Sequence, residues 1–303
     1  DITLIFHLLE YVCLGSKDLE ADAMKGRMQQ GGVLVFLSGW GDIAQLLELL
    51  AVHPEFGDAS SYIVLPLHGS IAPQQQRQVF KRDQNKRKIV LATNIAETSI
   101  TIDDIVVVID GCKVKEKLYD PYTQMASLTC SFVSKASSRQ RKGRGGRCQQ
   151  GICYSLVSSA RFDALKDFQD PELLRTPLEE LCLQIKLLSN IPIGEFLSKA
   201  PSPPEKVAVR DAILGLQRIG ALDASEQLTK LGFVLGKLPL EPRLGRMVIL
   251  AISFGCLDPI LNIVVSLGYR DPFLIPLDNK SRNECNAAKL KFSGNTNSDH
   301  LCN

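Results

Sequence analysis

The residues best suited to chemistry form one octet, Gln140–Arg147, with the sequence QRKGRGGR. Arg141, Arg144 and Arg147 recur every third residue, so on a helix they would share one broad face. Guanidinium groups stay charged and bind phosphate through paired hydrogen bonds, so a triphosphate would suit this face. A disordered Arg/Gly tail or a solvated helix would give the same octet, and the octet alone does not separate these readings.

A second polar group occupies the segment from Lys88 to Asp103, KIVLATNIAETSITID. An apolar run opens here into a loop of short polar side chains: Thr93, Asn94, Glu97, Thr98, Ser99, Thr101 and Asp103. Hydroxyl and amide groups of this kind contact phosphates and sugars without reading bases. The Asp103 carboxylate can accept a hydrogen bond from a ribose hydroxyl. A helix start capped by Thr98 or Ser99, with no ligand, is the alternative interpretation.

Residues 1–160 alternate short apolar runs with helical stretches, which predicts an α/β domain with a mostly parallel sheet. The expected buried strands are Val33–Leu37, Tyr62–Leu67, Lys88–Ala92 and Ile105–Asp110. Helices are expected over Ile43–Leu50 and from Pro73 toward Phe80. Ligands of such sheets bind at the carboxyl ends of strands. We therefore expect binding residues directly after the strands: Ser38, Gly39, His68, Gly69, Ser70, Thr93, Asn94, Asp110 and Gly111.

The pattern changes twice beyond this sheet. Val114–Tyr119 and Ala126–Phe132 flank a turn-rich tetrad and predict an inserted β-hairpin. From about Phe162 the chain becomes helical, and the segment from Leu216 to Gly232 is compatible with a winged-helix module. The last residues, up to Asn303, end without a capping signal, so we expect a truncated helical domain there.

Composition excludes several classes of protein. The 303 residues carry a net charge of only +2, but residues 135–147 hold six basic residues and no acidic one. The nine cysteines form no C-x-x-C pair, which predicts reduced thiols and no metal site. No apolar run is long enough to span a membrane and no signal peptide is visible. We expect an intracellular protein, with the choice between nucleus and cytoplasm left open.

In this order and spacing, the segments resemble the second RecA-like lobe of the DEAH/RHA ATP-dependent RNA helicases, with a lean toward the RHA-like subgroup. The resemblance covers essentially the whole chain. The matching segments are Val33–Ile43 (motif IV), Leu67–Ser70 (motif IVa), Lys88–Asp103 (motif V), Gln140–Arg147 (motif VI), Val108–Pro121 (the approach to a strand-separating hairpin), and Pro171–Arg175, Leu178–Leu181 and Leu238–Pro242 (winged-helix and ratchet regions).

The resemblance implies a P-loop NTPase-type fold and three domains, at residues 1–168 (RecA-like lobe), 169–232 (winged helix) and 233–303 (start of the ratchet domain). Arg144 and Arg147 would be arginine fingers on the γ-phosphate of ATP, and Gln140 would position the attacking water. Phe80 would stack on adenine, Asp103 would hold the ribose, and Thr101 and Arg141 would also bind the nucleotide. Ser38, Gly39, Ser70, Thr93 and Asn94 would hold the RNA backbone.

Motif VI departs from the family at Lys142 and Gly145, since alanine is common in the family at one or both of these positions. A glycine within a helix costs about 1 kcal/mol relative to alanine, so Gly145 is expected to loosen the helix that carries the fingers.

The sequence contains no G-x-x-x-x-G-K-[ST] segment and no Asp-Glu-x-His after a strand. The groups that bind the β- and γ-phosphates and Mg²⁺ are therefore expected in a first lobe, upstream in the same polypeptide, and this stretch alone is expected to hydrolyse ATP negligibly. The leading hypothesis is the C-terminal motor lobe of a 3′-to-5′ RNA helicase. The alternative is a non-catalytic, helicase-derived RNA-binding or adaptor module. A dinucleotide-binding enzyme is excluded because no G-x-G-x-x-G follows the first strand.

Overall fold

A computed structural model describes residues 1–15, 31–71, 73–83, 85–97, 101–120, 122–123, 125–145, 150–269 and 279–294. The chain divides into two compact units. Unit 1 comprises residues 1–116 and 129–169, and unit 2 comprises residues 117–128 and 170–303. None of the described helices is long and apolar enough to cross a membrane.

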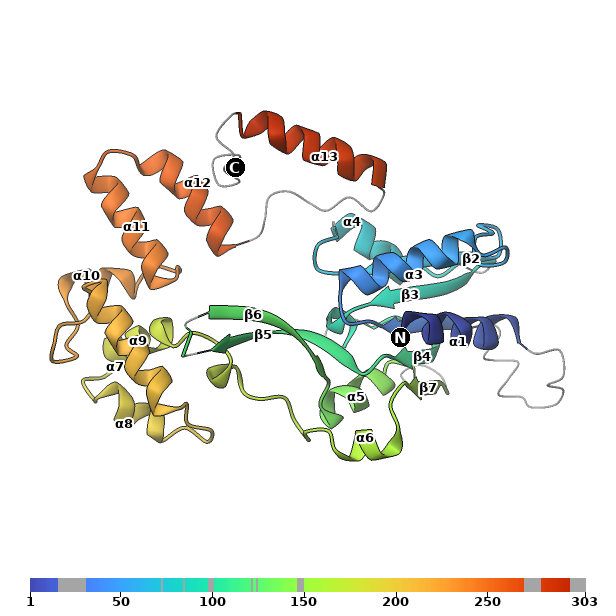
Figure 1. Cartoon of the computed structure of the whole chain (residues 1–303), viewed down its shortest axis with the longest axis horizontal. Coiled ribbons are helices and arrows are strands. Elements are labelled where there is room, and N and C mark those ends of the chain that lie inside the picture. Colours follow the sequence, from blue (N-terminus) through green and yellow to red (C-terminus); the bar gives the residue numbers. More distant parts are fainter. Residues whose placement is uncertain are drawn as a thin grey trace. The chain divides into compact units, whose positions relative to one another are not determined.

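Unit 1 is built on a five-stranded sheet in the order β2-β3-β1-β4-β7, in which every neighbouring pair is parallel (Figure 1). The strands are β1 (Gly32–Phe36), β2 (Tyr62–Leu67), β3 (Arg87–Ala92), β4 (Ile105–Asp110) and β7 (Ile152–Ser155). The four expected strands and the mostly parallel sheet are confirmed. The short edge strand β7 was not foreseen, because its four residues carry no distinctive pattern.

Both faces of the sheet are buried, which explains the unbroken apolar runs. Val33 and Val35 of β1 pack on one face beneath α1 (Ile2–Leu14) and α3 (Trp40–Val52). Leu34 and Phe36 point to the opposite face, which is covered by η1 (Arg77–Phe80), η2 (Asn94–Ala96) and α5 (Lys135–Lys142), while the short helix α4 (Pro73–Gln76) leads into η1. The helix expected from Pro73 to Phe80 is thus one α-helical turn continued by a 3₁₀ turn.

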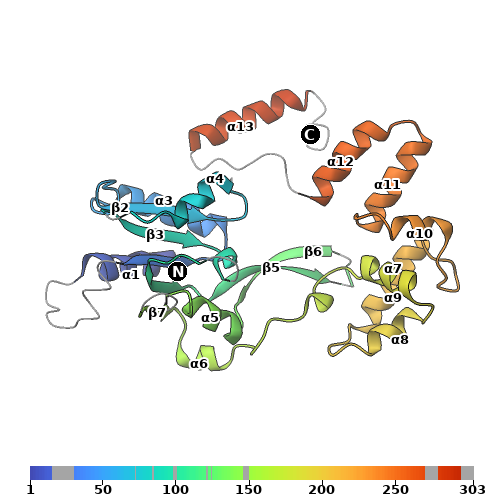
Figure 2. The ribbon, with the colours of Figure 1, turned by 180° about the vertical axis from the view of Figure 1, so that it is seen from behind.

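A two-stranded sheet of β5 (Lys113–Asp120) and β6 (Met125–Phe132) follows β4, which confirms the inserted hairpin (Figure 2). Its base belongs to unit 1 and its tip to unit 2. At the base, the Val133 amide donates to the Cys112 carbonyl. In unit 2, the Tyr119 amide donates to the Arg175 carbonyl. The helix α6 (Ser159–Asp163) lies in unit 1.

Unit 2 is helical. Its elements are η3 (Glu172–Leu174), α7 (Glu179–Leu188), α8 (Ile193–Ser198), α9 (Lys206–Arg218), α10 (Lys230–Leu235), α11 (Pro242–Ser253), α12 (Leu257–Gly268) and α13 (Asn279–Phe292). α7, α8 and α9 pack around one apolar core (Figure 2). The extended wing expected after α9 is reduced to a single antiparallel bridge between Leu222 and Leu228. Asp223 closes this short connection, because its carboxylate accepts the amides of Ser225 and Gln227.

Gly151, before β7, allows a close backbone approach. A Cβ atom there would lie 2.0 Å from the Gly145 carbonyl oxygen and 2.5 Å from that of Val106. We expect Gly151→Ala to lower the free energy of unfolding by about 1–3 kcal/mol, the usual range for overpacking, in urea denaturation. The control is Gly41→Ala, because Gly41 lies in α3 and its Cβ would meet nothing within 4 Å. Equal effects of the two substitutions would contradict this close approach.

Candidate functional site

The carboxyl ends of four strands are aligned and form one edge of the sheet, called here the carboxyl edge. Phe36 is in register with Ala92 and Asp110, and Leu67 is in register with Ala92. The ladder continues one residue further, since Leu37 donates to the Ala92 carbonyl. The residues that follow β1, β2 and β3 therefore lie along this edge.

All five residues predicted to hold the RNA backbone lie on the carboxyl edge. Gly39 and Thr93 are buried, Ser38 and Ser70 are half-buried, and Asn94 is exposed. The Ser38 hydroxyl and amide both donate to the Asp42 carboxylate in the first turn of α3. The structure thus brings together the residues of this predicted group.

His68 shapes the loop after β2. Its Nδ1 accepts the Ser70 amide at 3.1 Å, and its ring lies 5.7 Å from that of Trp40. Partial burial lowers the pKa of His68 below its ordinary value, which favours the neutral ring that this hydrogen bond requires. The orientation of Ser70 therefore depends on an uncharged His68.

Asp110, the last residue of β4, is fully buried and controls the entry into the hairpin. Its Oδ1 accepts the Cys112 amide at 2.8 Å and its Oδ2 accepts the Ser138 hydroxyl at 3.3 Å. Cys112 has φ 54°, a left-handed conformation that side chains rarely adopt and that a neighbouring aspartate can stabilise. Burial, and next the Asp110 charge, raise the pKa of the Cys112 thiol to about 12, so this thiol is not reactive.

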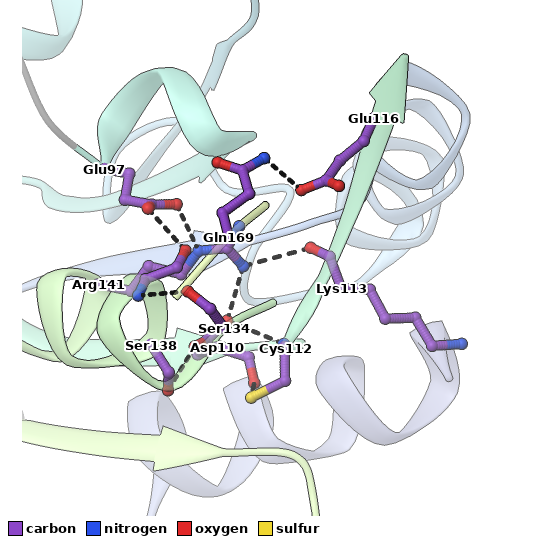
Figure 3. Close-up of polar contacts among 10 residues, drawn as sticks. Glu97, Asp110, Cys112, Lys113, Glu116, Ser134, Ser138, Arg141 and Gln169 are labelled. Atoms are coloured by element: carbon purple, nitrogen blue, oxygen red, sulfur yellow. Dashed lines mark hydrogen bonds and ion pairs between the residues drawn. The ribbon is translucent and has the colours of Figure 1, made fainter. Parts of the chain in front are cut away.

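Arg141 of α5 lies at the centre of this region and has no exposed surface (Figure 3). Its Nε pairs with Glu97 Oε2 at 3.1 Å, and its Nη1 pairs with Asp110 Oδ1 at 2.9 Å. The same Nη1 donates to the Lys113 carbonyl at 3.2 Å. One side chain therefore joins the loop after β3, the end of β4 and the first residue of the hairpin.

Other contacts of α5 support the same network. The Ser137 hydroxyl donates to Glu97 Oε1 at 2.6 Å, beside the Arg141 ion pair. The guanidinium of Arg141 also lies over the Phe36 ring, 4.9 Å from its centroid. A buried charge is tolerated where a counter-charge is supplied, and two carboxylates supply it here through Nε and Nη1, although Nη2 is buried without a hydrogen-bond partner.

The structure corrects two expectations for motif VI. First, α5 ends at Lys142, so Arg141 and Arg144 do not share a helical face. Second, the complete burial of Arg141 argues against its expected direct contact with a nucleotide and gives it a positioning role. Gln140 is exposed and Arg144 is half-buried. Arg147 lies outside the described residues.

Gly145 is also not helical, so the expected cost of glycine in a helix does not apply. It is buried in a turn, where a Cβ would lie 3.1 Å from Val108 Cγ2 and 3.4 Å from the Val106 carbonyl. These contacts place Gly145 beside the middle of β4. The edge of the sheet opposite the carboxyl edge is called here the amino edge.

The residues predicted to bind the nucleotide's sugar lie at the amino edge. Thr101 and Asp103 are exposed and precede β4, which begins at Ile105. This pair therefore lies apart from the residues that directly follow the strands, and its binding of a nucleotide stays a prediction. The six residues of β4 separate the two edges by roughly 17 Å.

Lys88, a residue not foreseen from the sequence, connects two predicted nucleotide contacts. Its amino group is buried, pairs with Asp104 at 2.9 Å and donates to the Val79 carbonyl at 2.9 Å. Asp104 and Val79 are the chain neighbours of Asp103 and Phe80. Phe80 is half-exposed, at 50%. Lys88 thus fixes both segments against each other while the side chains of Phe80 and Asp103 stay accessible.

Comparison with known proteins agrees with this architecture. Residues 17–149 match the helicase conserved C-terminal domain, residues 212–240 the winged-helix part of the helicase associated domain (HA2), and residues 241–302 its ratchet-like part. The crystal structure of the DEAH/RHA helicase HrpB of Escherichia coli superposes with a TM-score of 0.71 at 30% sequence identity, covering 82% of this chain and 30% of that chain.

Two relatives match nearly the full chain. The DExH-box ATP-dependent RNA helicase DExH1 of Arabidopsis thaliana is 46% identical, covering 99% of this chain and 29% of the relative. The ATP-dependent DNA/RNA helicase DHX36 of Homo sapiens is 45% identical, covering 99% of this chain and 28% of the relative. The chain thus spans less than a third of the length of these relatives.

A RecA-like lobe with a parallel sheet, followed by both parts of the HA2 domain, defines the C-terminal motor region of a helicase. The chain belongs to the DEAH/RHA family of helicases, as its motifs predicted.

Replacing Arg141 by methionine should leave Asp110 and Glu97 without their buried partner. Breaking one side of a buried ion pair costs about 3–5 kcal/mol, so we expect a loss of this size in the free energy of unfolding, measured by urea denaturation. Arg139→Met is the matched control, because Arg139 is exposed on the same helix. If both substitutions cost the same, Arg141 does not anchor the network.

Proposed function

We propose that this chain is the C-terminal motor lobe of an ATP-dependent RNA helicase that translocates 3′ to 5′. One observation supports this proposal most strongly. The residues suited to RNA follow the strands at the carboxyl edge of one sheet, and at that same edge the buried Arg141 links their loops to α5, the helix that carries Gln140 and leads into Arg144. A motor that converts hydrolysis into movement along RNA needs such a connection between its two ligands.

At the amino edge, ATP binds with its adenine on Phe80 and its ribose hydroxyl on Asp103, with Thr101 nearby. Arg144 and Arg147 stabilise the charge that develops on the γ-phosphate, and Gln140 orients the attacking water. The exposed position of Gln140, Thr101 and Asp103 supports these roles. Arg141 acts by positioning this segment.

At the carboxyl edge, Ser38, Gly39, Ser70, Thr93 and Asn94 hold the sugar–phosphate backbone of single-stranded RNA. Short polar side chains and backbone amides bind phosphate without reading sequence, which suits a translocating enzyme. The alignment of β1, β2 and β3 at this edge supports a continuous track.

A first RecA-like lobe, in the same polypeptide, supplies the P-loop and the ligands of Mg²⁺. The short share of the DExH-box relatives that this chain covers supports that arrangement. Within the chain we propose boundaries at residues 1–168 for the RecA-like lobe, 169–232 for the winged helix and 233–303 for the beginning of the ratchet domain.

The test is RNA-stimulated ATP hydrolysis by the full-length protein. Arginine fingers contribute roughly 10³–10⁵ in rate, so Arg144→Ala should lower kcat by at least about 10³-fold. RNA affinity, measured by fluorescence anisotropy, should stay unchanged because Arg144 is not among the residues proposed to hold the RNA backbone.

Lys142→Ala provides the control, since Lys142 is an exposed cation two residues away from Arg144. It should leave kcat close to wild type. Normal hydrolysis by the Arg144→Ala protein, or a loss of RNA binding with hydrolysis intact, would show that the two edges have been assigned wrongly.

A further inference from the structure

The base of the hairpin presents a basic face that the RNA track described above does not include. Cys112 and Val114 are buried in a small apolar cluster with Val133. Because side chains alternate along a strand, Lys113 and Lys115 point to the opposite, exposed face of β5. Both lysines belong to unit 1.

Phe132 lies on the same face and contacts two cations. Lys113 Nζ lies 5.8 Å from the centroid of its ring, and Arg161 Cζ from α6 lies 5.2 Å from it. Val133 pairs with Cys112, so Phe132 and Lys113 are cross-strand neighbours at the start of the hairpin. The ring therefore keeps two positive charges, from separate elements, close to one another.

These cations lack a counter-charge. Among the residues that the structure describes, none of Lys113, Lys115 and Arg161 forms an ion pair with a carboxylate. Glu116, the one acidic residue between Lys113 and Lys117, is hydrogen-bonded to Gln169 instead. Three neighbouring cations without an acidic partner are complementary to an anionic polymer.

The basic face is continuous with the carboxyl edge. A Cβ at Gly39 would lie 3.0 Å from Lys115 Cδ and 3.3 Å from its Nζ, so the Lys115 amino group lies against the loop after β1. The Lys113 carbonyl accepts Arg141 Nη1, which fixes the start of β5 relative to the sheet. The position of the basic face therefore connects it with Ser38 and Gly39, and its positive charge suits the same RNA strand.

We propose that Lys113, Lys115 and Arg161 form a phosphate-binding face for single-stranded RNA, which extends the track from Ser38 and Gly39 onto the base of the hairpin. The inference rests on the proposed function, because it assigns further contacts to the same RNA strand. Lysine and arginine bind phosphates without reading bases, so this face adds affinity without sequence preference.

Binding of a fluorescein-labelled oligouridylate to the full-length protein, measured by anisotropy over a series of KCl concentrations, tests the proposal. Each lost phosphate contact makes the slope of log K against log [salt] shallower by about 0.7 for a single strand. Lys113→Gln and Lys115→Gln should each give this change, and the double variant about twice as much. The effect should be equal with oligoadenylate.

Lys199→Gln is the charge-matched control, because Lys199 is exposed and paired with Glu195 in unit 2. Its slope should equal that of the wild type. Melting followed by circular dichroism checks that the exposed substitutions leave the fold intact. A wild-type slope in the double variant overturns the proposed face while leaving the RNA track in place. Absence of salt-dependent RNA binding by the wild-type protein would instead overturn the proposed function.

Discussion

The arrangement of the motor lobe depends on one buried charge, the guanidinium of Arg141. Two carboxylates pair with it: that of Glu97, in the loop after β3, and that of Asp110, the last residue of β4. Since an uncompensated charge is costly in a protein interior, each partner requires the others. The loop after β3, the end of β4, the hairpin and α5 are consequently held as one piece.

This constraint explains why the neighbouring residues can act. With Arg141 anchored, Gln140 stays exposed, and the turn that follows α5 places Gly145 against Val106 of β4. The same side chain fixes the Lys113 backbone, and with it the basic face beside Gly39. The loop after β3 and the start of the hairpin, both at the carboxyl edge, are thus joined to α5 through buried contacts rather than through exposed side chains.

The strands and the parallel sheet could be predicted because burial on both faces leaves unbroken apolar runs in the sequence. The residues predicted to hold RNA follow aligned strand ends, as the rule for parallel sheets led us to expect, and their role stays a prediction. The buried state of Arg141 could not be predicted, because its partners are 44 and 31 residues away in the chain. From spacing alone, Arg141 could not be distinguished from Arg144 and Arg147. Lys88 was missed for the same reason, since its partners Asp104 and Val79 come close to it only in the folded chain.

The position of Thr101 and Asp103 was also not foreseen from the sequence. Both follow β3 in the chain, but Asp103 lies two residues before β4 begins at Ile105. The length of the segment does not reveal this position. The reduced wing after α9 is a similar case, because Asp223 closes the turn by side-chain hydrogen bonds that shorten the extended segment.

Amide hydrogen exchange of the Arg141→Met protein tests the central claim most directly, under conditions in which both proteins remain folded. We expect faster exchange concentrated in residues 93–97 and 110–116, the segments that Arg141 joins, with α1 and α3 protected as in the wild type. Unchanged exchange in those two segments, or an increase spread evenly over α1 and α3, would contradict the claim that this side chain holds the loop after β3, the end of β4 and the start of the hairpin together.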